Sequence, residues 1–176
     1  MRLSEQRYGT QPAVRSQGSN QYQIRRAPAL ASPVPAVPLT VPGSLWELNR
    51  MRQEAAAPDT SPQRLAELAR MPAVRDEAAR NPHTPPATLA QLSADERPKM
   101  RWIVAGNLNT PPAVLERLLE DTYFEVRGEA ARNPSLPYRA VERLLRSPDR
   151  LAAEAAADNP AVSAATRALW QLGRDF

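Results

Sequence analysis

The chain has 176 residues, of which 42 % are hydrophobic and 5 % aromatic, with 19 prolines, one histidine and no cysteine. The lack of cysteine excludes a disulfide framework, a thiolate nucleophile and Cys-bound zinc or iron–sulfur centres, so the sequence predicts no metal and no cofactor. The formal net charge of +4 belongs entirely to residues 1–43, because the other 18 basic and 18 acidic residues cancel.

Residues 1–43 are predicted to form an extended or disordered basic tail. The segment is rich in Gln, Ser and Pro and ends in PALASPVPAVPLTVPG, whose prolines forbid a regular helix and favour polyproline II. With so few large apolar side chains, it cannot bury enough surface to offset the entropy of ordering. The candidate partner contacts in the tail are Arg2, Arg7, Tyr8, Arg15, Tyr22, Arg25 and Arg26.

Regular structure is predicted to begin at Ser44 and to continue through residues 44–176. Ser44 and Glu47 have the spacing of a capping box, in which the two side chains satisfy backbone donors reciprocally. Leu48, Met51 and Ala55 then follow on one helical face. This spacing predicts a first helix directly after the tail.

A segment of about 24–26 residues recurs five times in this domain. Its anchors lie at Ala57, Asn81, Asn107, Asn133 and Asn159. In one register, apolar residues coincide at Leu65, Leu89, Leu115 and Val141; in another, at Leu68, Leu92, Leu118, Leu144 and Trp170; alanine coincides at 79, 105, 131 and 157. Such self-similarity indicates a repeat array, with an eroded last unit that acts as a cap.

Each unit has the pattern of a short helical hairpin. Thr84 and Thr110 are expected to be N-caps, with Pro85 and Pro111 at the first helical position. Leucines at helical spacing follow, as in PPAVLERLLE, and then a polar turn and an alanine-rich helix such as FEVRGEAAR, which ends before Asn-Pro. Because one hairpin cannot bury its own apolar face, the hairpins are expected to stack into an all-α solenoid.

Three of these units resemble the leucine-rich repeat variant (LRV) family of bacterial repeat proteins. The matching segments are VRDEAARNPHTPPATLAQL from Val74, MRWIVAGNLNTPPAVLERL from Met100 and VRGEAARNPSLPYRAVERL from Val126. The resemblance covers residues ~50–172 and implies a right-handed α-solenoid that alternates α-helices with short, often 3₁₀, helices. The N-terminal iron–sulfur module of the first known type is not carried over, because this chain has no cysteine.

Arginines recur at equivalent positions of successive units. Arg75, Arg101 and Arg127 share one register, and Arg80 and Arg132 share another. Stacking would place equivalent residues about 10 Å apart on one face, as a stripe for an acidic protein, a phosphate or a nucleic acid. Alternatively, each arginine pairs with an acid within the chain or donates to carbonyls at a helix end, and the neutral charge of residues 44–176 favours this interpretation. The acids considered as its partners are Asp76, Glu77 and Glu129.

Trp102 departs from the repeat pattern. The same register in other units holds Asp76, Gly128 and Glu154. A large aromatic side chain at this position is predicted either to be exposed beside Arg101 as an interface anchor or to fill a groove against the turn SADERPK. Trp46 and Trp170 belong to terminal units, where they are predicted to cover the open ends of the stack.

The sequence predicts a protein that is not an enzyme. His83 lies in a polar turn whose equivalents are Asp59, Asn109 and Ser135, and the chain has no glycine-rich phosphate loop. The first hypothesis is a bacterial, cytoplasmic scaffold that binds another protein. The alternatives are a structural subunit of a large complex held by residues 1–43, and a nucleic-acid-associated protein. No run approaches the ~18 apolar residues of a membrane span.

Overall fold

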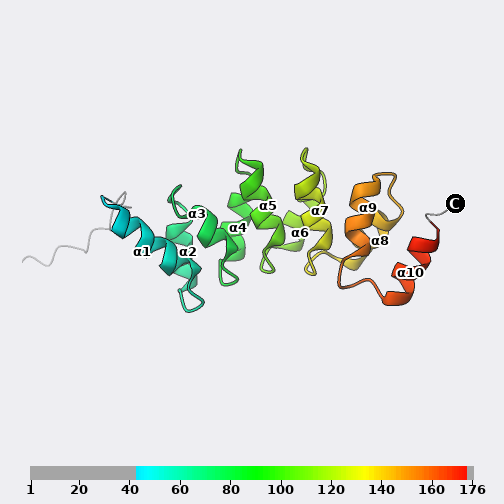
Figure 1. Cartoon of the computed structure of the whole chain (residues 1–176), viewed down its shortest axis with the longest axis horizontal. Helices are drawn as coiled ribbons and strands as arrows, with labels where there is room; N and C mark the ends of the chain where they lie inside the picture. Colours follow the sequence, from blue (N-terminus) through cyan, green and yellow to red (C-terminus); the bar gives the residue numbers. More distant parts are fainter. Residues whose placement is uncertain (1–42, 174–176) are drawn as a thin grey trace, which may run out of the picture. The chain divides into compact units, whose positions relative to one another are not determined.

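The computed structural model describes residues 43–173, so the predictions for the tail, including its seven candidate contact residues, lie outside the described residues (Figure 1). Residues 43–173 form ten α-helices and no strand, which confirms the predicted all-α class. The helices are α1 (Leu45–Ala56), α2 (Pro62–Leu68), α3 (Arg75–Arg80), α4 (Pro86–Leu92), α5 (Pro98–Gly106), α6 (Pro112–Leu118), α7 (Phe124–Arg132), α8 (Tyr138–Leu145), α9 (Arg150–Ala157) and α10 (Ala164–Leu172).

The helices alternate between two layers. The odd-numbered helices α1, α3, α5, α7 and α9 each pack against the next odd-numbered one, and each even-numbered helix from α2 to α8 packs against the odd-numbered helix that follows it (Figure 1). The predicted hairpins are therefore α2–α3, α4–α5, α6–α7 and α8–α9. Hydrogen bonds with i→i+3 spacing lie in the turns between the two helices, as from the N–H of Met71 to Leu68 O (2.9 Å).

The predicted apolar registers form the core. Leu65, Leu89, Leu115 and Val141 are fully buried on the even-numbered helices. Burial of each such leucine is worth about 1.5–3 kcal/mol, so these positions dominate the stability of the stack. The alanines at 79, 105 and 131 are also fully buried, and their small side chains let the odd-numbered helices approach closely.

The ends of the array differ from the prediction. Ser44 Oγ accepts from the N–H of Glu47 (3.2 Å) as expected, but the Glu47 carboxylate accepts from the N–H of Gly43 (2.8 Å), so it reaches one residue beyond Ser44. Trp46 is 67 % exposed and stacks on Arg50, so it does not cover the first helix. Trp170 is half-buried and its indole N–H donates to Leu145 O (3.1 Å).

The prediction that Thr84 and Thr110 are N-caps is wrong. Helices α4 and α6 begin one residue later than expected, and Pro85 and Pro111 are the N-cap residues. Each of these prolines precedes another proline, which pushes it out of the α region into an extended conformation. The threonine hydroxyls are buried and donate to the preceding odd-numbered helix instead, as from Thr110 Oγ1 to Val104 O (2.6 Å).

Replacing Thr110 with valine is expected to reduce the free energy of unfolding by roughly 1 kcal/mol, because Val104 O keeps its bond from the N–H of Asn107 and loses only the hydroxyl donor. Apolar side chains fit this register, since Leu136 and Val162 occupy it in later units and are buried. Urea unfolding monitored by circular dichroism measures the change, with Thr110→Ser as the hydroxyl-bearing control. Equal midpoints for wild type and Thr110→Val would contradict the assignment.

Buried asparagines connect successive units. The Asn107 side-chain amide donates to Ala79 O (2.8 Å) and Asn81 O (3.0 Å), and its oxygen accepts from the N–H of Asn109 (2.8 Å). The same three bonds recur around Asn81, Asn133 and Asn159. All four side chains are buried. This asparagine ladder ties each helix end to the previous repeat and fixes the spacing of the odd-numbered helices.

Candidate interaction surface

The three arginines of the main predicted stripe are fastened within the chain. Each forms an ion pair with an aspartate that precedes the next odd-numbered helix. The pairs are Arg75–Asp95 (2.9 Å), Arg101–Asp121 (2.6 Å) and Arg127–Asp149 (3.2 Å). Their side chains are only 25 %, 15 % and 23 % exposed, respectively. The three arginines therefore pair within the chain, but their partners are Asp95, Asp121 and Asp149 and not the predicted Asp76, Glu77 and Glu129.

The same arginines also satisfy backbone carbonyls of the turns. Arg75 Nε donates to Ala69 O (2.9 Å), Arg101 Nη1 donates to Asp95 O (2.9 Å), and Arg127 Nη1 donates to Asp121 O (2.9 Å). Hydrogen bonds from Arg101 lower the pKa of Asp121 below its usual value, although burial opposes the shift. The arginine stripe thus links consecutive turns, and its guanidinium groups are largely occupied.

The second pair of predicted arginines is more open. Arg80 is exposed and forms no hydrogen bond or ion pair within residues 43–173. Arg132 lies 3.8 Å from Asp158, and both side chains are at least half exposed. An exposed pair of this kind contributes little to stability. Arg80 is therefore the predicted arginine that is most available to a partner.

Trp102 is 42 % exposed on α5, which agrees with the prediction of an exposed aromatic residue. Its indole N–H forms no hydrogen bond among the described residues. The ring stands between two hollows of the surface. One is lined by Arg80, Ile103, Gly106, Asn107 and Glu129, and the other by Pro98, Lys99, Tyr123, Glu125 and Val126.

Tyr123 supplies a second aromatic ring at this place. It is 49 % exposed, its N–H donates to Asp121 Oδ1 (2.9 Å), and the guanidinium of Arg101 lies 5.6 Å from its ring centroid. Since Arg101 is itself held by Asp121, the ring has a fixed support. Tyr123 was not among the residues predicted from the sequence. The available signal was that it stands where the previous unit has the polar Arg97.

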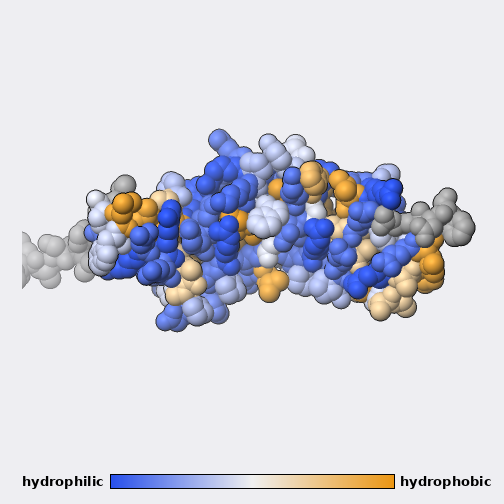
Figure 2. Space-filling model, viewed as in Figure 1, coloured by the Kyte–Doolittle hydropathy of each residue, from blue (hydrophilic) through white to orange (hydrophobic). Residues whose placement is uncertain are grey.

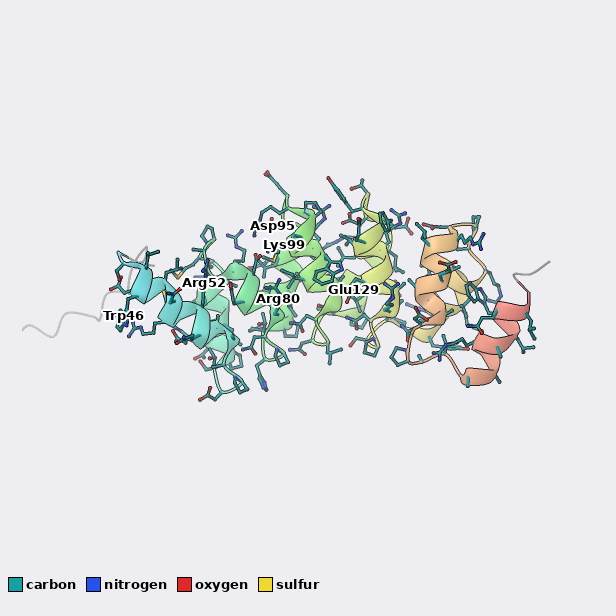
Figure 3. The ribbon with its side chains drawn as sticks, in the orientation of Figure 1. Trp46, Arg52, Arg80, Asp95, Lys99 and Glu129 are labelled. Atoms are coloured by element: carbon teal, nitrogen blue, oxygen red, sulfur yellow. The ribbon has the colours of Figure 1, made fainter. Side chains whose placement is uncertain are left out.

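Gly106 makes room for a charged side chain beside Trp102. A Cβ atom at Gly106 would lie only 2.9 Å from Glu129 Oε1, so the carboxylate occupies the space that a side chain would take. Arg80 on α3 and Glu129 on α7 lie on either side of α5 (Figure 3). Neither forms an ion pair or hydrogen bond within residues 43–173. Two opposite, unpaired charges therefore flank the tryptophan.

We define the Trp102 surface as the group formed by Arg80, Lys99, Trp102, Tyr123, Glu125 and Glu129. Lys99 differs from the other charged members because it pairs with Asp76 (2.8 Å). The face drawn in Figure 2 is largely hydrophilic, with hydrophobic patches near α1, around α7 to α9 and near α10. An aromatic pair within a polar face, rimmed by free charges, has the composition of a protein-binding centre.

The part of the chain that the structure describes contains neither a cluster of metal-binding side chains nor a membrane-spanning helix. Among residues 43–173 no group of three or more His, Cys, Asp or Glu side chains could hold a metal ion. His83 is exposed, and its backbone N–H donates to Asn81 Oδ1 (2.9 Å), as expected for a residue in a turn. None of the described helices has the length and apolar character needed to cross a bilayer.

The stacked hairpins and the ladder between them define a helical repeat protein. Residues 73–134 match the family model of the Leucine Rich Repeat Variant domain. The match spans α3 to α7 and confirms the resemblance found in the repeat motifs. Comparison with curated proteins and with solved structures gave no match.

Proposed function

We propose that this chain is a non-enzymatic scaffold that binds another protein through the Trp102 surface. The observation that carries the proposal is Trp102 itself: a tryptophan, 42 % exposed, whose indole N–H has no acceptor among the described residues. Tryptophan, tyrosine and arginine dominate the energetics of protein interfaces, and Trp102, Tyr123 and Arg80 all lie in this surface. The repeat-domain match agrees with a scaffold, since stacked repeats present extended binding surfaces.

The arginine stripe has a supporting part in this proposal. Arg75, Arg101 and Arg127 stabilise the turns from which the surface is built, and Arg101 holds the ring of Tyr123. A partner that contacted these guanidinium groups directly would have to displace the aspartates that already pair with them. We therefore assign partner contact to Arg80 and Trp102 before the stripe.

Replacing Trp102 with alanine is expected to weaken partner capture by about tenfold or more, the usual effect of removing a central aromatic anchor. The measurement is quantitative affinity capture from an extract of the source cells with full-length wild type, Trp102→Ala and Trp46→Ala. Trp46 is the matched control, because it is 67 % exposed but lies on α1. Equal recovery of the same partner by wild type and Trp102→Ala would contradict the proposal.

A further inference from the structure

We infer that the Trp102 surface binds an extended, proline-containing segment of its partner, with a basic residue of that segment directed at Glu125 on α7. The inference rests on the proposed function and names the chemistry of the partner. It starts from the hollow between Trp102 and Tyr123, which is also lined by Pro98, Lys99 and Val126. Val126 is 1 % exposed and belongs to the hydrophobic core, whereas the other residues of this lining do not.

The two rings line one hollow, which we call the slot, and proline docks in aromatic-lined grooves. Trp102 comes from α5, and Tyr123 is the N-cap residue of α7, so the rings belong to adjacent stacked helices. Both are close to half exposed and can each offer an aromatic face to a ligand. Proline-rich segments dock into aromatic-lined grooves because their polyproline II conformation is already formed and little entropy is lost on binding.

The free indole N–H selects an extended ligand over a helical one. Trp102 donates no hydrogen bond within residues 43–173, so it can donate to a carbonyl of the ligand. A polyproline II segment has no internal hydrogen bonds and presents all its carbonyls. A helical ligand has already paired the carbonyls along its length and could offer only those of its last turn.

The charges beside the slot favour a basic residue. Glu125 and Glu129 lie one helical turn apart on α7, and neither forms a hydrogen bond or ion pair within the described residues. The cation nearest in the same lining, Lys99, is neutralised by Asp76 at 2.8 Å. Arg80 lines only the hollow on the other side of Trp102. An arginine or lysine of the ligand therefore meets a free carboxylate at Glu125.

The slot is also held in place before any ligand arrives. Arg101 Nε and Nη2 donate to the two oxygens of Asp121 (2.6 and 3.0 Å), and the same guanidinium lies over the Tyr123 ring. The Asp121 carboxylate in turn accepts from the N–H of Tyr123. A ring held in this way loses little freedom on binding, which favours recognition of short segments.

The test uses the full chain and a fluorescein-labelled peptide, Arg-Ala-Leu-Pro-Pro-Leu-Pro, in a polarisation titration. We expect saturable binding that Trp102→Ala and Tyr123→Ala each weaken about tenfold. Phe124→Ala is the matched control, since Phe124 is 52 % exposed, adjoins Tyr123 and lies outside both hollows. A peptide with alanine in place of its prolines should bind at least several-fold more weakly.

A charge exchange tests the orientation. A peptide with Glu in place of its Arg should bind wild type poorly and bind Glu125→Lys better than wild type does, while the Arg peptide shows the opposite order. Failure of the Arg peptide to saturate, or equal losses from Trp102→Ala and Phe124→Ala, overturns the inference. If the peptide fails but Trp102→Ala still loses the captured partner, the protein-binding proposal stands and only the assigned ligand class is wrong.

Discussion

Replacing Asn107 with alanine is expected to lower the free energy of unfolding by about 2–3 kcal/mol, because it leaves a buried backbone carbonyl and a partly buried backbone N–H without a partner. Ala79 O loses the donor at 2.8 Å, and the N–H of Asn109 loses its acceptor. Asn81 O is less affected, since it keeps a bond from the N–H of Thr84 (3.1 Å). Each orphaned buried group costs about 1–3 kcal/mol.

The loss of these hydrogen bonds should also make the repeats on the two sides of Asn107 unfold less cooperatively. Asn107 joins the hairpin α4–α5 to the hairpin before it, and repeat stacks are stabilised mainly by contacts between neighbours. Weakening one interface favours separate unfolding of the two sides, so the urea transition of Asn107→Ala should broaden as well as shift. Circular dichroism against urea concentration records both changes.

Asn109→Ala is the matched control for this substitution. Asn109 is exposed and donates only one side-chain bond, to Thr84 O (2.9 Å), so its loss should cost roughly 1 kcal/mol or less. If the two variants unfold at the same urea concentration, the asparagine ladder does not stabilise the stack in the way we describe.

Asn107→Asp tests the direction of the hydrogen bonds. A carboxylate there would face two carbonyl oxygens, so the introduced acid should have a raised pKa in the folded state. Such a group stabilises the fold only while it is protonated, and stability should therefore fall as pH rises through its unfolded and folded pKa values. The variant should be less stable than wild type at pH 7 and recover part of the difference near pH 4.

The architecture could be predicted from the sequence because every repeat has the same pattern of apolar and small residues. Leucines and alanines that coincide at 24–26-residue steps fix which faces are buried, and they indicated the hairpins correctly. The details that failed depend on partners in another unit. A buried threonine before two prolines has the pattern of an N-cap, and only the stacked structure shows that Thr110 donates to Val104 instead. The role of the asparagines was missed for the same reason, since their acceptors lie 24 to 28 residues away.

The candidate surface was predictable only where it breaks the repeat. Trp102 stood out because equivalent positions are small or polar, and it is exposed. Tyr123 also replaces a polar residue of the previous unit, but Glu125 and Glu129 show no such contrast. The grouping of all three around Trp102 follows from the packing of α5 on α7. The sequence shows that the arginines share a register. Only the geometry of the turns shows that they pair within the chain and do not form an open binding stripe.

The Arg101–Asp121 pair should show how much the arginine stripe contributes. Replacing Asp121 with alanine is expected to cost about 3 kcal/mol, because it leaves a guanidinium that is only 15 % exposed without its carboxylate. Asp158→Ala is the matched control: its pair with Arg132 spans 3.8 Å between side chains that are 65 % and 50 % exposed, and it should cost less than about 1 kcal/mol.

Acid should remove the same contribution. Because hydrogen bonds from Arg101 lower the folded pKa of Asp121, the pair stabilises the fold above the unfolded pKa of about 4, and this stability is lost as pH falls through the folded pKa. The gap between wild type and Asp121→Ala in urea unfolding should therefore be full at pH 7 and smaller near pH 2. A gap that does not change with pH would mean that the aspartate acts through packing alone. The same pair supports Tyr123, so Asp121→Ala should also weaken peptide binding under conditions in which the variant is still fully folded. Asp158→Ala should leave peptide binding unchanged.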